Sequence, residues 1–279
     1  MMEGKLEPLL AVRDLSATFH RHGAPSRVVD GISFDIAPGE SVGFVGESGC
    51  GKSVTARAIL RLAPEGSSIE LGGRILFRGQ DLLRLDAAAM TDIRGRDIAM
   101  VFQDPMSSLN PVLSVGAQID DMLIRHTGLS RRAARRRAIE LLDLVGIHDP
   151  ASRADDHPHQ FSGGMRQRVL IAIAVSCQPA LLIADEPTTA LDVTVQAQIL
   201  RLLLRLCREL GMALMLITHD FGVIAGMVER VHVMQAGAIV ETGAVDALFA
   251  APRHPYTRAL LDAVPRLETG GLDSTAGPA

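Results

Sequence analysis

The sequence predicts an α/β fold built on a mainly parallel sheet, and three observations support that prediction. Short apolar runs of strand length alternate with longer amphipathic runs of helix length. A glycine-rich turn at residues 46–53 joins one apolar run directly to a helical pattern. Strand–helix–strand alternation of this kind places successive strands parallel, with helices on both faces of the sheet.

Strands are predicted first in the N-terminal part of the chain. Apolar residues occur around 10–12 and alternate with polar ones over 32–36, before a Pro38-Gly39 turn. A further extended pair is predicted around 75–77 and before Gln80-Asp81. The N-terminal part of the chain is therefore predicted to be rich in strands.

The sheet domain and its helices follow. A buried strand over 42–45 leads into the glycine-rich turn, and the helix after it is expected to stop at Pro64. Residues 113–177 are mostly helical in pattern and look like an insertion into the sheet domain. Strands are then predicted at 181–184, at 213–217 and over 231–240, with a turn at Gly237 in the last of them. An amphipathic helix of 195–206 is predicted between the first two, and it is expected to stop at Gly211.

The turn at 46–53 fills the pattern G-x-x-x-x-G-K-[ST] of a phosphate-binding loop, with the residues Gly46, Glu47, Ser48, Gly49, Cys50, Gly51, Lys52 and Ser53. Glycines allow backbone N–H groups to approach a phosphate closely, and the helix that follows directs its positive end at the same anion. Lys52 is expected to reach the β- and γ-phosphates, and the Ser53 hydroxyl to bind Mg²⁺. The loop therefore predicts binding of a nucleoside triphosphate.

Three further strand ends carry side chains suited to hydrolysis. Asp185 and Glu186 end an apolar strand, where Asp185 is expected to hold Mg²⁺ and Glu186 to act as general base for the attacking water. His219 ends another strand and is expected to steady the γ-phosphate, while Gln103 is expected to orient water or touch Mg²⁺. A structural role for the histidine alone is the plainer alternative.

A second anion site is predicted at Ser162, Gly163 and Gly164, which open an apolar helix. One nucleotide needs only one phosphate-binding site of this kind. A second anion site is useful if it covers the γ-phosphate of a nucleotide that another subunit holds.

Composition restricts the partners. Aromatic residues are only 3% of the chain and the formal net charge is −4, which argue against a general nucleic-acid binder. Cys50, Cys177 and Cys207 are widely spaced and read as reduced thiols. The arginine run at 131–137 is interpreted as the solvated face of a helix. We expect any membrane role to come through a partner.

From about residue 8 to 265, the chain resembles the ATP-binding cassette (ABC) transporter ATPases. The family's motifs occur in order: the Walker A loop at 46–53, the Q-loop Gln103, the signature at 162–167, the Walker B end Asp185-Glu186, the D-loop Ala190-Leu191-Asp192 and the switch His219. The resemblance implies a P-loop NTPase (RecA-like) fold with an N-terminal antiparallel β subdomain. It also implies a helical subdomain inserted at about 105–170. The tail over 266–279 is expected to be flexible, because its last dozen residues are rich in Gly, Ser and Thr.

The resemblance further implies a head-to-tail dimer, with each ATP between Walker A of one subunit and the signature of the other. ATP is expected to contact Phe19 and Val54 besides the loop residues 46–53. The ATP of the opposite subunit is expected to contact Ser162, Gly163, Gly164 and Asp192. Mg²⁺ is expected at Ser53, Gln103 and Asp185, and catalysis at Glu186, His219 and Gln103.

Within that family, the segments 101–111 and His254 to Leu260 resemble importers of dipeptides, oligopeptides and nickel. Met165 stands where the common signature has Gln, which resembles the first of two ATPase subunits and suggests a non-identical partner. Two membrane permeases and, indirectly, a solute-binding protein are expected as well. No Cys follows Cys207, so an iron–sulfur cluster is not expected, and nickel or another small solute gains weight as cargo.

The expected location is the cytoplasmic face of a bacterial inner membrane. Two other classes remain as alternatives: a soluble ABC-type ATPase that acts on DNA or the ribosome, and a metabolic kinase that uses the same loop. The first usually has long coiled-coil insertions or two cassettes in one chain, and the second has no use for the signature. No nucleic-acid partner is expected.

Overall fold

The computed structural model describes residues 7–20, 25–63, 68–189 and 191–263. The predicted tail of 266–279 lies outside the described residues, and the domain boundaries at 8–265 and 105–170 remain predictions. The strands are β1 (Leu10–His20), β2 (Ser26–Ile36), β3 (Ser41–Val45), β4 (Ser68–Phe77), β5 (Gln80–Asp81), β6 (Ile98–Val101), β7 (Leu181–Asp185), β8 (Ala213–Thr218), β9 (Arg230–Gln235) and β10 (Ala238–Ala244). The α-helices are α1 (Lys52–Ile59), α2 (Ala87–Ile93), α3 (Pro105–Ser108), α4 (Val115–Thr127), α5 (Arg131–Leu144), α6 (Pro150–Arg153), α7 (Gly163–Val175), α8 (Val193–Leu210), α9 (Phe221–Ile224), α10 (Val245–Ala250) and α11 (Pro255–Asp262), with short 3₁₀ turns at Leu82–Arg84 and Pro158–Gln160.

The central sheet has six strands in the order β10-β9-β3-β8-β7-β6. All neighbouring pairs are parallel except β10 and β9, which form an antiparallel hairpin. The predicted strands at 42–45, 181–184 and 213–217 are β3, β7 and β8, so the predicted mainly parallel α/β fold is confirmed. The predicted N-terminal strands form a separate antiparallel sheet in the order β2-β1-β4-β5.

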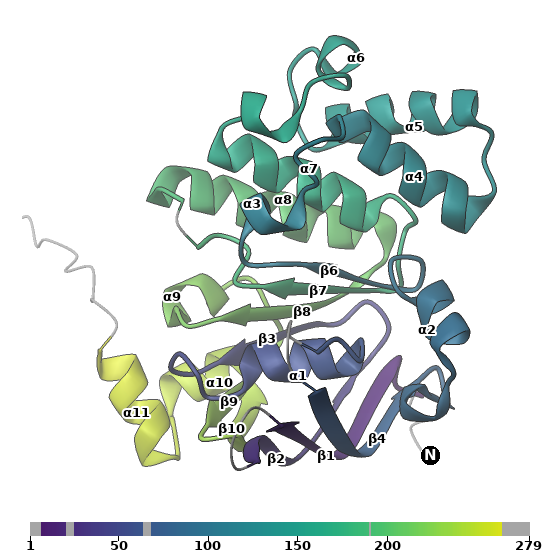
Figure 1. Cartoon of the computed structure of the whole chain (residues 1–279). Coiled ribbons are helices and arrows are strands. Elements are labelled where there is room, and N and C mark those ends of the chain that lie inside the picture. Colours follow the sequence, from purple (N-terminus) through teal and green to yellow (C-terminus); the bar gives the residue numbers. More distant parts are fainter. Residues whose placement is uncertain (1–6, 21–24, 64–67, 190, 264–279) are drawn as a thin grey trace, which may run out of the picture.

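The central sheet is buried on both faces. Along β7, Leu181 and Ile183 pack on the side of α1 and the antiparallel sheet, while Leu182 and Ala184 pack on the side of α7 and α8. This alternation follows from the two-residue period of a strand. Figure 1 shows the resulting layers, with α7 and α8 over one face and α1 between the two sheets.

The helix after the phosphate loop is shorter than predicted. We expected it to run to Pro64, which lies outside the described residues, but α1 ends at Ile59. Arg61 adopts a left-handed backbone with φ of 51°. The Arg94 side chain then donates to the carbonyls of Leu60 at 2.8 Å and Arg61 at 3.2 Å, which satisfies two carbonyl groups just beyond the end of the helix.

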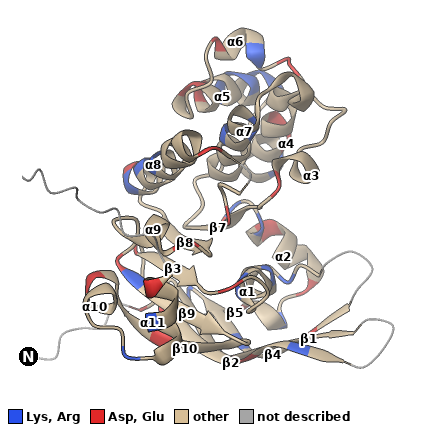
Figure 2. Cartoon of the chain, turned by 90° about the vertical axis from the view of Figure 1, so that its left-hand side faces the viewer, with Lys and Arg blue, Asp and Glu red and all other residues tan. Residues whose placement is uncertain are grey.

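Five helices lie between β6 and β7 in the chain and gather at one end of the molecule (Figure 1). The arginine run of 131–137 opens α5, where basic residues are visible in Figure 2. Arg135 pairs with Asp120 and Asp155, and Arg131, Arg132 and Arg136 are exposed, as expected for a solvated helix face. Within the described residues, no helix is both long and apolar enough to cross a membrane.

Candidate nucleotide site

A cavity of about 350 Å³ lies over the phosphate loop, at the carboxyl end of β3. Its lining combines residues of the loop and of the start of α1 with one residue of β2 and with residues that follow β6 and β7: Val28, Ser48, Gly49, Gly51, Lys52, Ser53, Val54, Gln103 and Glu186. Parallel sheets place ligands at the carboxyl ends of their strands, where this cavity is found.

Close approach of neighbouring backbone explains the glycines of the loop. A Cβ at Gly46 would lie 2.2 Å from the Met234 carbonyl oxygen, and one at Gly51 would lie 2.9 Å from the Val28 carbonyl oxygen. Both residues also have positive φ, at 152° and 107°. No other residue fits these two positions without displacing the neighbouring strands.

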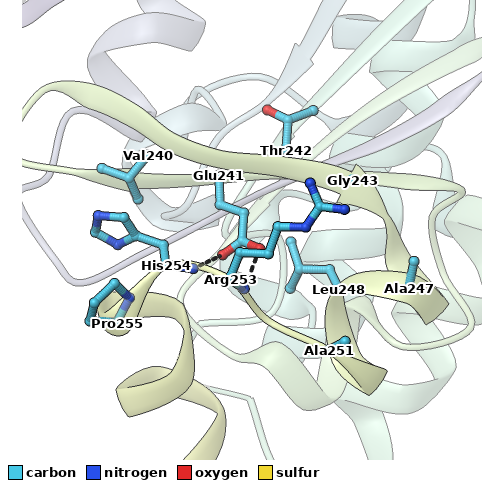
Figure 3. A pocket seen from close by; sticks show the side chains of 10 residues that line it. All are labelled: Val240, Glu241, Thr242, Gly243, Ala247, Leu248, Ala251, Arg253, His254 and Pro255. Carbon is cyan, nitrogen blue, oxygen red and sulfur yellow. Dashed lines mark hydrogen bonds between the residues drawn. The ribbon is translucent and has the colours of Figure 1, made fainter.

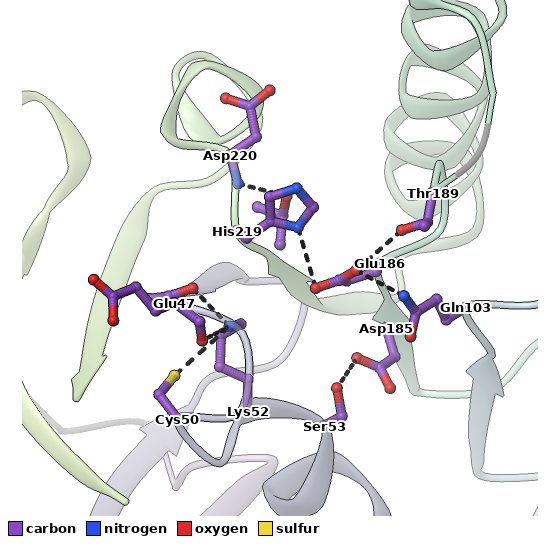
Figure 4. A network of polar contacts seen from close by, with 12 residues as sticks. Glu47, Cys50, Lys52, Ser53, Gln103, Asp185, Glu186, Thr189, His219 and Asp220 are labelled. Atoms are coloured by element: carbon purple, nitrogen blue, oxygen red, sulfur yellow. Dashed lines mark hydrogen bonds and ion pairs between the residues drawn. The ribbon is translucent and has the colours of Figure 1, made fainter. Parts of the chain in front are cut away.

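Lys52 is folded back over the loop, as Figure 4 shows. Its ammonium donates hydrogen bonds to the carbonyl oxygens of Gly46 at 2.7 Å and Glu47 at 2.8 Å, and it lies 3.6 Å from the Cys50 sulfur. The side chain is buried, with 4% of the residue exposed. The cation is thus held at the mouth of the cradle, where a polyphosphate would meet it.

Ser53 and Asp185 meet across the floor of the site. The Ser53 hydroxyl donates a 2.7 Å hydrogen bond to the Asp185 carboxylate. Burial raises the pKa of Asp185, an effect that the Ser53 hydrogen bond and the cations Arg57 and Lys52 oppose. Asp185 is only 1% exposed. Because a buried carboxylate is costly without a compensating charge, this position favours the binding of a cation.

Glu186 is the centre of the polar network. Its backbone is left-handed, with φ of 45°, and its N–H donates to the Ile217 carbonyl oxygen at 2.9 Å. One carboxylate oxygen accepts from the Gln103 amide and from the Thr189 hydroxyl, each at 3.0 Å. The other oxygen lies 3.2 Å from Nδ1 of His219. Three separate segments therefore fix one carboxylate beside the loop (Figure 4).

The signature residues lie at the start of α7, as the sequence predicts. Ser162 is the N-cap, and its hydroxyl accepts from the Met165 N–H at 3.4 Å. Gly164 touches α8, since a Cβ there would lie 2.6 Å from Cγ1 of Val195. Asp192 caps α8 in turn, accepting from the Val195 N–H at 2.9 Å.

The structure thus brings together most, but not all, of the predicted site residues. Lys52, Ser53, Gln103, Asp185, Glu186 and His219 form one contiguous group. Ser162, Gly163, Gly164 and Asp192 lie outside the lining of that cavity, and so does Phe19, which is half-buried in β1 opposite Ser26.

Sequence reasoning missed three contacts. Val28 of β2 lines the cavity, and Thr189 binds Glu186. Tyr256 of α11 accepts from the N–H of Glu47 in the loop. A threonine three residues after a strand-end carboxylate is a signal for the second contact. The other two depend on tertiary packing alone.

Comparison with known families and proteins is consistent with this geometry. Residues 29–189 match the family described as ABC transporter, and residues 240–277 match the family described as oligopeptide/dipeptide transporter, C-terminal region. The dipeptide transport ATP-binding protein DppD of Bacillus subtilis (strain 168) is 51% identical over 97% of this chain and 81% of its own length. The oligopeptide transport ATP-binding protein OppD of the same organism is 52% identical over 94% of this chain and 74% of its own length.

Solved structures agree in fold. The ATP-binding cassette MJ0796, in a dimeric post-hydrolysis state bound to ADP and Pi, has a TM-score of 0.74 and 28% identity over 85% of this chain and 98% of its own. The cassette cbiO1 from Clostridium perfringens, part of the transporter complex cbiONQ, has a TM-score of 0.73 and 28% identity over 87% of this chain and 91% of its own. The chain belongs to the ABC transporter family of ATP-binding cassettes, and is accordingly a nucleotide-binding ATPase. This membership leaves the DNA- or ribosome-acting ATPase and the metabolic kinase without support.

Proposed function

We propose that this protein hydrolyses Mg²⁺·ATP to power a membrane importer of peptides or a related small solute. The observation that most supports this is that Ser53, Gln103 and Glu186 line the cavity over the phosphate loop, and that Ser53 bonds the buried Asp185 carboxylate beneath it. A loop that only bound a phosphate would need no buried metal carboxylate and no fixed base beside it.

The residues present fit a magnesium ion. Mg²⁺ prefers oxygen ligands and is usually held by one or two protein oxygens together with substrate phosphates. Ser53 Oγ and Asp185 Oδ1 are already 2.7 Å apart, and Asp185 is a buried carboxylate with no cationic side chain in a salt bridge to it among the described residues. The bound ion would neutralise charge on the β- and γ-phosphates. Ser53 and Asp185 would hold it, with the Gln103 amide within the same network.

Glu186 is the proposed general base. As the water oxygen bonds to the γ-phosphorus and the bond to the β-phosphate oxygen breaks, the carboxylate takes the water proton. Gln103, Thr189 and His219 hold that carboxylate in place through the three contacts described above. Lys52 would exchange its carbonyl partners for the β- and γ-phosphates and stabilise the charge there.

A second cassette completes the proposed site. Ser162, Gly163 and Gly164 present a hydroxyl and helix N-terminal amides, yet they lie outside the cavity of their own chain. We infer that they cover the γ-phosphate of a nucleotide held by a neighbouring cassette, with Asp192 in the same interface. Dimeric solved structures of the similar cassette MJ0796 support this arrangement. The Phe19 ring is proposed to stack on adenine.

A groove of about 480 Å³ is the proposed docking place for a permease. It lies between α1, α2, β6, α4 and α7, with an apolar floor that includes Leu60, Met100 and Ile173. The segment after Gln103 adds exposed apolar side chains nearby: Met106 is 60% exposed and Val112 is 78% exposed. Because Gln103 binds Glu186, closure on nucleotide would move this segment and the permease on it.

The proposed cargo is a peptide, because the relatives named above are dipeptide and oligopeptide transport proteins and the C-terminal region matches their family. Nickel has no such support. The chain would act with a non-identical ATPase, two permeases and a solute-binding protein at the cytoplasmic face of a bacterial inner membrane.

Extraction of the native complex in detergent tests the proposal. Mass spectrometry should identify two permeases and a second cassette, and the reconstituted complex should show ATP hydrolysis stimulated by a di- or oligopeptide with its binding protein. A complex with Lys52→Ala is the control that should lose hydrolysis. Recovery of ribosomal proteins or DNA instead of permeases would contradict the transport function, and stimulation by Ni²⁺ alone would contradict only the cargo.

A further inference from the structure

The C-terminal helix α11 reaches the phosphate loop through its one aromatic residue. The Tyr256 hydroxyl accepts a 3.0 Å hydrogen bond from the backbone N–H of Glu47, 209 positions earlier in the chain. Glu47 is the second residue of the loop, and its carbonyl oxygen accepts from the Lys52 ammonium at 2.8 Å. Tyr256 therefore bonds the N–H of Glu47, and Lys52 bonds the carbonyl oxygen of the same residue.

The β9–β10 hairpin holds the same loop at a second point. The Gly237 N–H donates to the Cys50 carbonyl oxygen at 3.0 Å, and the Cys50 N–H donates to the Glu47 carbonyl oxygen at 3.3 Å. The turn from Glu47 to Cys50 is closed by its own hydrogen bond and held from outside at both ends. Both outer contacts come from the C-terminal part of the chain.

Glu241 of β10 fixes the start of α11, as Figure 3 shows. Its carboxylate accepts from the backbone N–H groups of Arg253 at 2.8 Å and His254 at 3.0 Å. His254 is the N-cap of α11, with Nδ1 accepting from the Tyr256 N–H at 3.3 Å. These four residues make a continuous path from the sheet to the Tyr256 ring.

Packing restricts the ring as well. Tyr256, Leu260 and Leu261 pack as partly buried side chains against the main core. Burial raises the pKa of Tyr256, so its hydroxyl stays neutral near physiological pH. A neutral hydroxyl accepts from an amide and leaves no charge beside the phosphates.

We propose that Tyr256 is a positioning residue for nucleotide binding, which holds the Glu47 peptide so that the loop is preformed for the triphosphate. The inference rests on the proposed function, since it assumes that residues 46–53 bind ATP. Nucleotide that moves Lys52 away from the Glu47 carbonyl would in turn alter the environment of Tyr256. The state of the loop and the docking of α11 are thus coupled.

Kinetics of the assembled transporter give the first test, with Tyr256→Phe, which keeps the ring and removes only the hydroxyl. Loss of a hydrogen bond of ordinary net strength predicts a rise of about three- to tenfold in KM for ATP. The kcat should stay within about twofold, because Tyr256 does not touch the reacting atoms. Glu241→Gln, which weakens the anchor of α11, should raise KM in the same direction. Leu261→Met, a volume-conserving change on α11, is the matched control and should behave as wild type.

A spectroscopic readout gives the second test. The chain contains one Tyr and no Trp, so 3-fluorotyrosine labels Tyr256 alone. Its single ¹⁹F resonance should shift when Mg²⁺·ATP is added, and Lys52→Ala should abolish the shift. An unchanged KM in Tyr256→Phe together with an unmoved resonance would overturn the inference, and so would an equal rise of KM in Leu261→Met. Wild-type protein that neither binds nor hydrolyses ATP would overturn the proposed function itself, a result that the wild-type sample reports separately.

Discussion

The Gln103 amide donates a 3.0 Å hydrogen bond to the carboxylate of Glu186, although the two residues are 83 positions apart. Gln103 follows β6 at the entrance to the helices α3–α7, and Glu186 follows β7 where the chain returns from them. The bond therefore joins the proposed base to the segment on which a permease would dock. In the proposed mechanism, this bond couples hydrolysis of ATP to movement of that segment.

Glu186→Gln should retain ATP binding and slow hydrolysis by roughly 10²–10⁴-fold, because the amide cannot accept the water proton. It should also trap two cassettes around unhydrolysed nucleotide. Phosphate release and sedimentation in the presence of Mg²⁺·ATP measure the two effects. Thr189→Val, which removes only one contact to the carboxylate, is the control and should slow ATP hydrolysis far less than Glu186→Gln. Near-normal turnover in Glu186→Gln would remove Glu186 from its proposed role.

Mg²⁺ affinity should depend on pH through Asp185. Burial raises its pKa in the folded state, and Mg²⁺ needs the ionised form, so protons and the metal compete. Below that raised pKa, the Mg²⁺ concentration for half-maximal ATP hydrolysis should rise by up to about tenfold per pH unit. Mg²⁺ titrations at successively lower pH, from neutral down to the limit of protein stability, measure it. A Mg²⁺ requirement that does not rise anywhere as the pH falls would contradict the assignment.

Asp185→Asn should separate metal binding from folding. The folded-state pKa of Asp185 lies above its unfolded value, so its ionised form destabilises the folded state at neutral pH, and this cost is relieved as the pH falls through the folded pKa. The isosteric amide removes that charge. We therefore expect the nucleotide-free variant to have an unfolding temperature at or above that of wild type, with no further rise on adding Mg²⁺·ATP. A large drop in the nucleotide-free protein would show that the carboxylate is needed for folding.

Gly164→Ala should destabilise the packing of α7 on α8. The new Cβ would lie 2.6 Å from Val195 Cγ1, and overpacking of this kind costs about 1–3 kcal/mol. Gly163→Ala is the matched control, since its Cβ would only touch Leu191 Cδ2 at 3.4 Å. It should leave the free energy of unfolding within about 0.5 kcal/mol of wild type, as substitutions without such a clash usually do. Urea unfolding measures both, and an equal loss in the two variants would contradict the packing argument.

Much of the site could be predicted from the sequence because its chemistry sits at strand ends. Asp185, Glu186 and His219 lie at the ends of short apolar runs that indicate buried strands, and parallel strands bring those ends to one edge. The phosphate loop is local in sequence, so its pattern specified both its turn and its helix. Ser162 was predictable as a helix N-cap for the same local reason.

The rest depended on contacts that no local pattern encodes. Just beyond the end of α1, the carbonyls of Leu60 and Arg61 accept from Arg94, a side chain more than thirty residues away. The contact of Tyr256 with Glu47 joins residues 209 positions apart in the sequence. Val28 reaches the cavity only because β2 packs beside the loop. Such relationships appear once the chain is folded.

In the proposed dimer, Ser162 of one cassette completes the nucleotide site of the other. A photoreactive group on the γ-phosphate of ATP tests this in a complex where only this chain carries Lys52→Ala, which empties its own loop. We expect the peptide containing Ser162 of this chain still to be labelled, because the nucleotide is held by the neighbouring cassette. If emptying this chain's own loop also abolished labelling of that peptide, the proposed dimer site would be contradicted.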